Sequence, residues 1–226
     1  MIPAFLKAFA QVSDPTFRRV LALGVFGALV IFVLLNLTAD WVLVQLQLFA
    51  TGWLDTAAKV LGSLGSFLLT LLLFPAVASM IIGVLLDDVV RAVEARHYPD
   101  LPPARERPMS EDLATTARFA GKLILVNLLA LPLYLILIWF GVGVVLYYVI
   151  NGYLVGREYW ELVALRRLTP EQADTLRRSR RLYLWLVGAG CAFLLSVPLV
   201  NLLAPLIATA TMVHVFQALR SRDRAV

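Results

Sequence analysis

The sequence predicts an all-α integral membrane protein, with one membrane domain over residues 1–226. Of the 226 residues, 61% are hydrophobic and 15% are charged, whereas charged residues make up roughly 25% of an ordinary soluble domain. Four long stretches contain no Asp, Glu, Lys or Arg. A soluble domain of this size has too small an interior to bury so much apolar surface. Soluble globular, disordered and fibrous classes are therefore excluded.

The first two charge-free stretches predict single transmembrane helices. They cover Val20–Ala39 and Val60–Leu86, with 20 and 27 residues, and a helix of about 20 residues crosses a bilayer. We expect the helices at about 15–39 and about 58–96. The second helix is expected to continue out of the membrane into a charged segment, because no helix breaker directly follows its apolar stretch.

The last two charge-free stretches, Leu123–Gly156 and Leu182–Leu219, predict helical hairpins. Their 34 and 38 residues are too many for one span and few for two spans with a turn. Breaks are expected at Gly141–Gly143 and across Pro198–Pro205. Halves of about 15–17 residues reach roughly 22–26 Å, and the hydrocarbon core is about 30 Å thick. Length alone leaves open two tightly paired full spans or a re-entrant hairpin that turns back inside the membrane.

A basic helical linker over 157–181 is expected between the hairpins, which we place at about 112–156 and about 182–219. Thr169 to Gln172 matches a capping box, which predicts the start of a helix. Four arginines in five residues suit a surface of anionic membrane lipids, and they are Arg177, Arg178, Arg180 and Arg181. We do not expect nucleic acid as a partner.

The distribution of Lys and Arg predicts the orientation. All but one of the 20 basic residues lie at the N-terminus, in 87–122, in 157–181 and at 220–224. By the positive-inside rule these segments, and with them both termini, are expected in the cytoplasm. The first apolar stretch is too long for a signal peptide and no cleavage pattern follows it, so a multi-pass inner-membrane protein is predicted.

No residue pattern of an enzyme is present. The two histidines are far apart in sequence, and the single Cys191 excludes an internal disulfide and a cysteine-based zinc site. Gly121–Lys122 lacks both the earlier glycine and the following Ser or Thr of a phosphate-binding loop. We therefore expect no catalytic residue, no metal and no cofactor.

The start of the first helix is a candidate anion site. Pro15 suits the first helical position and Asp14 its cap, which places Arg18 and Arg19 about one turn into the helix. Helix-terminal N–H groups beside two guanidinium groups suit a tetrahedral dianion. Two observations oppose this. Arginines at a helix end often only anchor it to lipid headgroups, and the Asp14 carboxylate competes for the same N–H groups.

Two further polar positions lie where a pore would need them. Asp87 and Arg91 form an i,i+4 pair at the expected membrane boundary, as part of a pore mouth or as a solvated ion pair. Asn201 is the strongly polar side chain of the turn across Pro198–Pro205. It is expected either to pair with backbone groups freed by the prolines or to line a water-filled path.

Three stretches resemble the family of CysZ-type sulfate permeases of bacterial inner membranes, which includes the etoposide-induced membrane proteins. Ser13–Arg19 is similar to the family's opening pattern of Pro-Gly, an aliphatic residue and arginine, with Thr16 in place of the glycine. Val197–Pro205 is similar to its late Pro-Leu-x-Asn-Leu turn. Gly83–Asp87 is similar to its Gly-Leu-Leu-x-Glu, although Met80–Ile82 stand where the family has Pro-Phe-Asn.

The resemblance implies two long transmembrane helices with two re-entrant hairpins. It also implies channel-like uptake of sulfate for cysteine synthesis, in homo-oligomers of two or more chains. The sulfate contacts that it implies are at Arg18 and Arg19, to which we add Thr16 and Phe17 as expected sulfate-binding residues. The polar pore network that it implies is at Asp87 and Arg91, and we expect Asn201 to belong to the same network. Two alternatives stay open: a non-transporting scaffold or lipid-organising membrane protein, and a permease for another oxyanion or small solute.

Overall fold

The computed structural model describes residues 1–46, 52–105, 109–137, 139 and 141–223. In this described part every secondary-structure element is an α-helix, so the predicted all-α class is confirmed. The helices are α1 (Ile2–Ala10), α2 (Pro15–Gln45), α3 (Gly52–Val84), α4 (Leu86–His97), α5 (Met109–Leu137), α6 (Gly143–Ala164), α7 (Pro170–Ser179), α8 (Arg181–Ser196) and α9 (Val200–Asp223).

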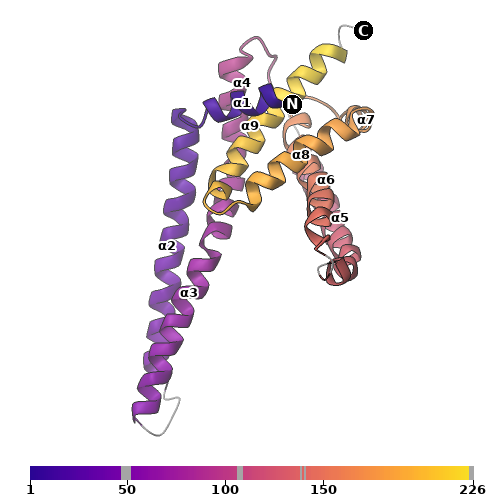
Figure 1. The fold of residues 1–226 in the computed structure, drawn as a ribbon. Coiled ribbons are helices and arrows are strands. Elements are labelled where there is room, and N and C mark those ends of the chain that lie inside the picture. Colours follow the sequence, from indigo (N-terminus) through magenta and orange to yellow (C-terminus); the bar gives the residue numbers. More distant parts are fainter. Residues whose placement is uncertain (47–51, 106–108, 138, 140, 224–226) are drawn as a thin grey trace.

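Two pairs of helices extend as separate arms from one end of the molecule. Figure 1 shows α2 and α3 as the longer arm and α5 with α6 as the second, while α8 and α9 lie between them. The short helices α1, α4 and α7 and the first turns of α2 lie at the end of the molecule opposite the arm tips, with α7 apart from the other three. We call this the polar end.

Three described helices are long and apolar enough to cross a membrane: α2, α3, and α9 over Val200–Ser221. The protein is therefore a multi-pass membrane protein. The apolar windows of α2 and α3 are only 17% buried, whereas that of α9 is 83% buried. The long arm thus presents leucine, valine and phenylalanine to its surroundings, as lipid-facing helices do. In contrast, α9 is enclosed by other helices.

Small and polar residues hold α2 against α3. Gly24 lies so close to α3 that a Cβ there would be 2.4 Å from Ile82. Farther along the arm, the Asn36 side-chain amide donates to the Thr70 hydroxyl at 2.8 Å. Close backbone approach and interhelical hydrogen bonds are the two means by which helices associate in lipid.

The continuous helix expected at about 58–96 is divided in the structure. α3 ends at Val84 and α4 begins at Leu86. At Leu85 the N–H donates to the carbonyl of Ile82, three residues back, in the tight geometry that ends an α-helix. α4 then restarts with Asp87 and a second carboxylate in its first turn, where the helix dipole favours acidic groups.

The turn between α5 and α6 occurs where glycine predicts it. Gly141 has φ +68°, a conformation that glycine adopts without strain. α6 then continues to Ala164. The boundary expected at 156, between a hairpin and a basic linker, thus lies inside a helix. α6 continues through Gly156 and Arg157 without a break.

α7 begins with the predicted capping box. The Thr169 hydroxyl accepts from the Gln172 N–H, and the Gln172 side chain accepts from the Thr169 N–H at 3.0 Å. The turn from α8 to α9 spans Val197–Leu199, and Leu199 has φ +65°. It occurs at the predicted break, while Pro205 lies within α9.

The crossing of α6 and α8 is unusually close. A Cβ on Gly188 of α8 would lie 2.1 Å from the carbonyl oxygen of Gly152 on α6. It would lie 2.6 Å from both Cα and N of Gly156. The i,i+4 glycines of α6 therefore form a groove that receives the glycine of α8, as in small-xxx-small helix pairs.

Candidate functional site

The start of α2 lies at the polar end with its cap in the predicted place. Pro15 is the first helical residue and Asp14 is the N-cap, but the Asp14 side chain makes no capping hydrogen bond. Its carboxylate instead pairs with Arg96 of α4. The competition expected from Asp14 for the N–H groups of the first turn is therefore not seen. Arg96 brings a further guanidinium group to this end of α2.

The four residues after Pro15 are divided between the core and the surface. Phe17 is 1% exposed and packs in the hydrophobic core, and Thr16 is half-buried. Arg18 and Arg19 are exposed. Because the Phe17 side chain is enclosed, only its backbone N–H is positioned to meet a solute, whereas both arginines are open to one.

Asp87 and Arg91 are not paired as their spacing predicts. Arg91 donates to Asp88 at 2.8 Å, and Asp87 faces Arg166 with 3.4 Å between the charged atoms. The restart of the helix at Leu86 places both aspartates in the first turn of α4. There Asp88 lies three residues before Arg91, and Asp87 turns toward the segment that follows α6.

Asn201 lies in the first turn of α9 and is half-buried. Its backbone N–H donates to the Val197 carbonyl at 2.9 Å. No group in the described part of the chain donates to its side-chain oxygen, so the expected pairing with freed backbone is not seen at that atom. Nor does any hydrogen bond or ion pair among described residues join Asn201 to Arg18 or Arg19.

A buried ion pair at the polar end was not predicted. Both carboxylate oxygens of Glu94 on α4 accept from Arg167 at 2.8 Å, and the two side chains are 8% and 6% exposed. Arg167 also donates to the Pro102 carbonyl at 2.5 Å. These contacts join α4 and the loop after it to the end of α6. The only sequence signal for them is the presence of two charges, 73 residues apart.

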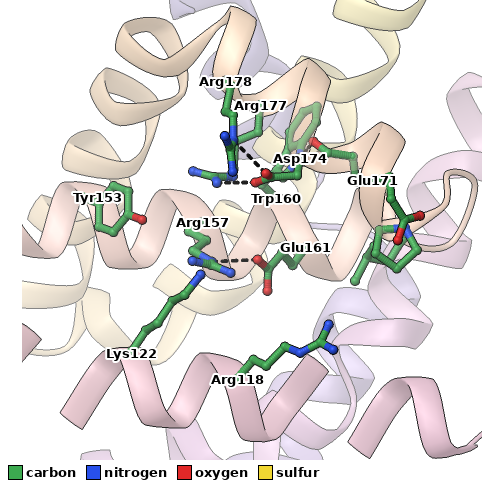
Figure 2. Close-up of a pocket in the computed structure, with 13 residues that line it drawn as sticks. Arg118, Lys122, Tyr153, Arg157, Trp160, Glu161, Glu171, Asp174, Arg177 and Arg178 are labelled. Atoms are coloured by element: carbon green, nitrogen blue, oxygen red, sulfur yellow. Dashed lines mark hydrogen bonds and ion pairs between the residues drawn. The ribbon is translucent and has the colours of Figure 1, made fainter. Parts of the chain in front are cut away.

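Cations from three helices surround a pocket of about 480 Å³ between α5, α6 and α7. Figure 2 shows these side chains converging on one space. The basic residues that line it are Arg118, Lys122, Arg157, Arg177 and Arg178. Three acids line the same pocket, namely Glu161, Glu171 and Asp174. From sequence, Arg157 and the α7 arginines were expected in one basic linker, but nothing predicted that Arg118 and Lys122 of α5 would face them.

The α7 side of the pocket is an ion-pair cluster. Asp174 contacts Arg177 and also pairs with Arg178 at 2.7 Å. Partial burial alone would raise the pKa of Asp174, but the two arginines outweigh it and hold that pKa below its usual range. Among the described residues, no group of three or more His, Cys, Asp or Glu side chains is placed to hold a metal ion.

Comparison with known proteins assigns the chain to a family. The sequence model of the family described as "Sulfate transporter CysZ/Etoposide-induced protein 2.4" matches residues 4–205. The chain belongs to this family. The family resemblance inferred from the three short stretches is therefore confirmed, and the match includes all the candidate residues from Thr16 to Asn201. No individually curated protein matches the chain.

Proposed function

We propose that this protein is an inner-membrane permease through which sulfate, or a related oxyanion, crosses passively. The observation that carries the proposal is the exposed pair Arg18–Arg19 in the first turn of a membrane-long helix. Family membership supports it, because the family description names a sulfate transporter. Uptake would supply cysteine synthesis.

The geometry at the start of α2 suits a doubly charged oxyanion. The first N–H groups of a helix lack intrahelical partners and carry partial positive charge. Here the capping carboxylate of Asp14 is drawn to Arg96, so it does not fill them. The Thr16 and Phe17 N–H groups, together with the guanidinium groups of Arg18 and Arg19, then supply charge-assisted hydrogen bonds to sulfate oxygens.

The length of α8 supports an arrangement in which the α8–α9 hairpin enters the membrane without crossing it, although α9 by itself is long enough to cross. On this proposal the α5–α6 hairpin also turns back inside the membrane. The 16 residues of α8 extend about 24 Å, less than the roughly 30 Å of hydrocarbon. In this arrangement the polar end lies in the cytoplasm, as the excess of Lys and Arg predicts. Asp87, Arg91 and Asn201 then line a polar path, completed by further copies of the chain in a homo-oligomer.

The membrane potential opposes the proposed direction of flow. A negative-inside potential opposes anion influx by about 2.3 kcal/mol per charge per 100 mV. Passive uptake of a dianion therefore requires that sulfate be consumed rapidly inside the cell. On this proposal the protein provides the path for sulfate, and its consumption inside the cell maintains the concentration gradient that drives uptake.

The test is flux of radiolabelled sulfate into proteoliposomes. We expect saturable uptake that Arg18→Ala/Arg19→Ala abolishes and that the control Arg180→Ala/Arg181→Ala retains. The control removes the same charge from an adjacent arginine pair beside α8. Uptake that survives in the first variant would refute the site, and competition with sulfite, thiosulfate and phosphate would rank the oxyanions. No uptake by folded, inserted protein would refute the permease and favour a non-transporting membrane scaffold.

A further inference from the structure

We propose that the pocket between α5, α6 and α7 binds the phosphate group of an anionic membrane lipid. This site lies on different helices from the start of α2. It does not depend on the proposed transport of sulfate.

The charges of the pocket leave cations available to a ligand. Two of its three carboxylates are engaged: Glu161 accepts from Arg157 at 2.6 Å, and Asp174 is held between two arginines of α7. The third, Glu171, lies at the start of α7 and is exposed. Within the described part of the chain, neither Arg118 nor Lys122 forms an ion pair or side-chain hydrogen bond. Both project from α5 into the pocket (Figure 2). The side of the pocket formed by α5 is therefore cationic.

Arg157 adds a buried donor that is not satisfied by protein. Its side chain is 9% exposed and its Nε donates to Glu161, but no described residue accepts a hydrogen bond from its buried Nη1. A buried charged donor without an acceptor is costly. Figure 2 shows Lys122 pointing toward the same guanidinium group. Two cations that converge beside an unused donor favour an anionic acceptor such as a phosphate oxygen.

Two walls of the pocket, α6 and α7, are held together by buried contacts. Trp160 of α6 is 1% exposed and donates from its indole N–H to the Ala173 carbonyl of α7 at 3.0 Å. The capping box at Thr169 sets where α7 begins. These contacts hold α7 over α6, so the backbone that carries the α7 arginines is fixed by buried structure. The Arg177 side chain is 16% exposed, whereas that of Arg178 is 77% exposed.

The position of the pocket favours a lipid over a free anion. On α5 the apolar stretch Gly121–Leu133 begins beside the pocket. On α6 all residues from Gly143 to Gly156 are uncharged, and Arg157 follows directly. The pocket thus lies where both helices change from apolar to charged, the depth of lipid headgroups. On α5, Leu125 and Leu129 follow Lys122 toward the turn between α5 and α6, and both are exposed. They offer an apolar surface for the acyl chain of the lipid.

The test is lipid binding to the purified full chain, measured by native mass spectrometry. The probes are dioleoylphosphatidylglycerol and, as the zwitterionic comparison, dioleoylphosphatidylcholine. We expect tighter binding of phosphatidylglycerol, weakened at least about tenfold by Arg118→Gln/Lys122→Gln, since charge-assisted hydrogen bonds are lost. Both residues are exposed, so the variant should fold, which its unfolding temperature checks.

The matched control is Arg180→Gln/Arg181→Gln, which removes two exposed arginines near α7 but outside the pocket. We expect this control to bind phosphatidylglycerol like the parent protein. Equal weakening in both variants would overturn the pocket in favour of a diffuse basic surface. Unchanged binding in Arg118→Gln/Lys122→Gln would also overturn it. If inorganic phosphate or sulfate displaced the lipid at comparable concentration, the assignment to a lipid would be wrong.

Discussion

Replacement of Gly188 by alanine tests the closest helix crossing in the described structure. The added Cβ would lie 2.1 Å from the Gly152 carbonyl oxygen and 2.6 Å from the backbone of Gly156. Because all three of these neighbouring atoms belong to the backbone, no side-chain rotation relieves the clash. α6 and α8 must move apart, and the buried surface around the crossing must open with them.

The magnitude follows from two opposing terms. Overpacking a well-packed interior costs about 1–3 kcal/mol, and an approach of 2.1 Å belongs at the upper end. Alanine returns about 1 kcal/mol through its higher helix propensity. The net loss is therefore about 2 kcal/mol. For a chain of this length, that lowers the unfolding temperature by roughly 4–8 °C.

The assay uses a cysteine already in place. Cys191, the only cysteine in the chain, is fully buried in α8, so a thiol-reactive dye labels it only when α8 opens. Gly156→Ala, whose nearest contact would be 2.8 Å, should show a smaller loss. Gly65→Ala on α3, with nothing within 4 Å, should be neutral or stabilising. If Gly188→Ala unfolds at the same temperature as Gly65→Ala, the close crossing is refuted.

Two further predictions concern charged groups at the polar end. Glu94→Leu should lower stability by roughly 3–5 kcal/mol because it leaves Arg167 buried and unpaired. The double variant Glu94→Leu/Arg167→Met should recover much of that loss in the same dye assay, and additive losses would contradict the pairing. Partial burial, together with the charge of Arg96, lowers the pKa of His97 below 6.5. The imidazole ring of His97 therefore binds a proton less readily in the folded state than in the unfolded state. The stability that the folded state gains from keeping His97 neutral is complete above pH 6.5 and is lost as the pH falls, because the unfolded state then takes up the proton first. We therefore expect the unfolding temperature of His97→Gln to fall less than that of the parent protein between pH 6.5 and about 5.

Local sequence signals predicted much of the helical architecture. Charge-free stretches located the apolar helices, and Gly141 and Pro198 marked the turns between paired helices. The capping box at Thr169 predicted the start of α7. These features depend on residues within one or two helical turns. The division at Leu85 had no such signal, since leucine is among the better helix formers.

Local sequence patterns did not predict which charged residues pair with one another. Spacing on one helix predicted a pair between Asp87 and Arg91, but Asp88 takes Arg91. Arg96 pairs with Asp14, 82 residues away. The pocket likewise combines α5, α6 and α7, which meet through contacts of α6 with α5 on one side and with α7 on the other. Such sites depend on tertiary contacts that a single sequence read along its length does not contain.

The enclosure of α9 has a consequence for how the protein is made. Ribosomes translate from the N-terminus, so α9 is made after every helix that packs around it. At about 5–20 residues per second, roughly 10–40 s pass between synthesis of Val20 and of Val200. During this interval Val20, Ile82 and Trp160 lack part of the core that later buries them. Folding therefore depends on a late step, in which α9 packs among helices that were made before it.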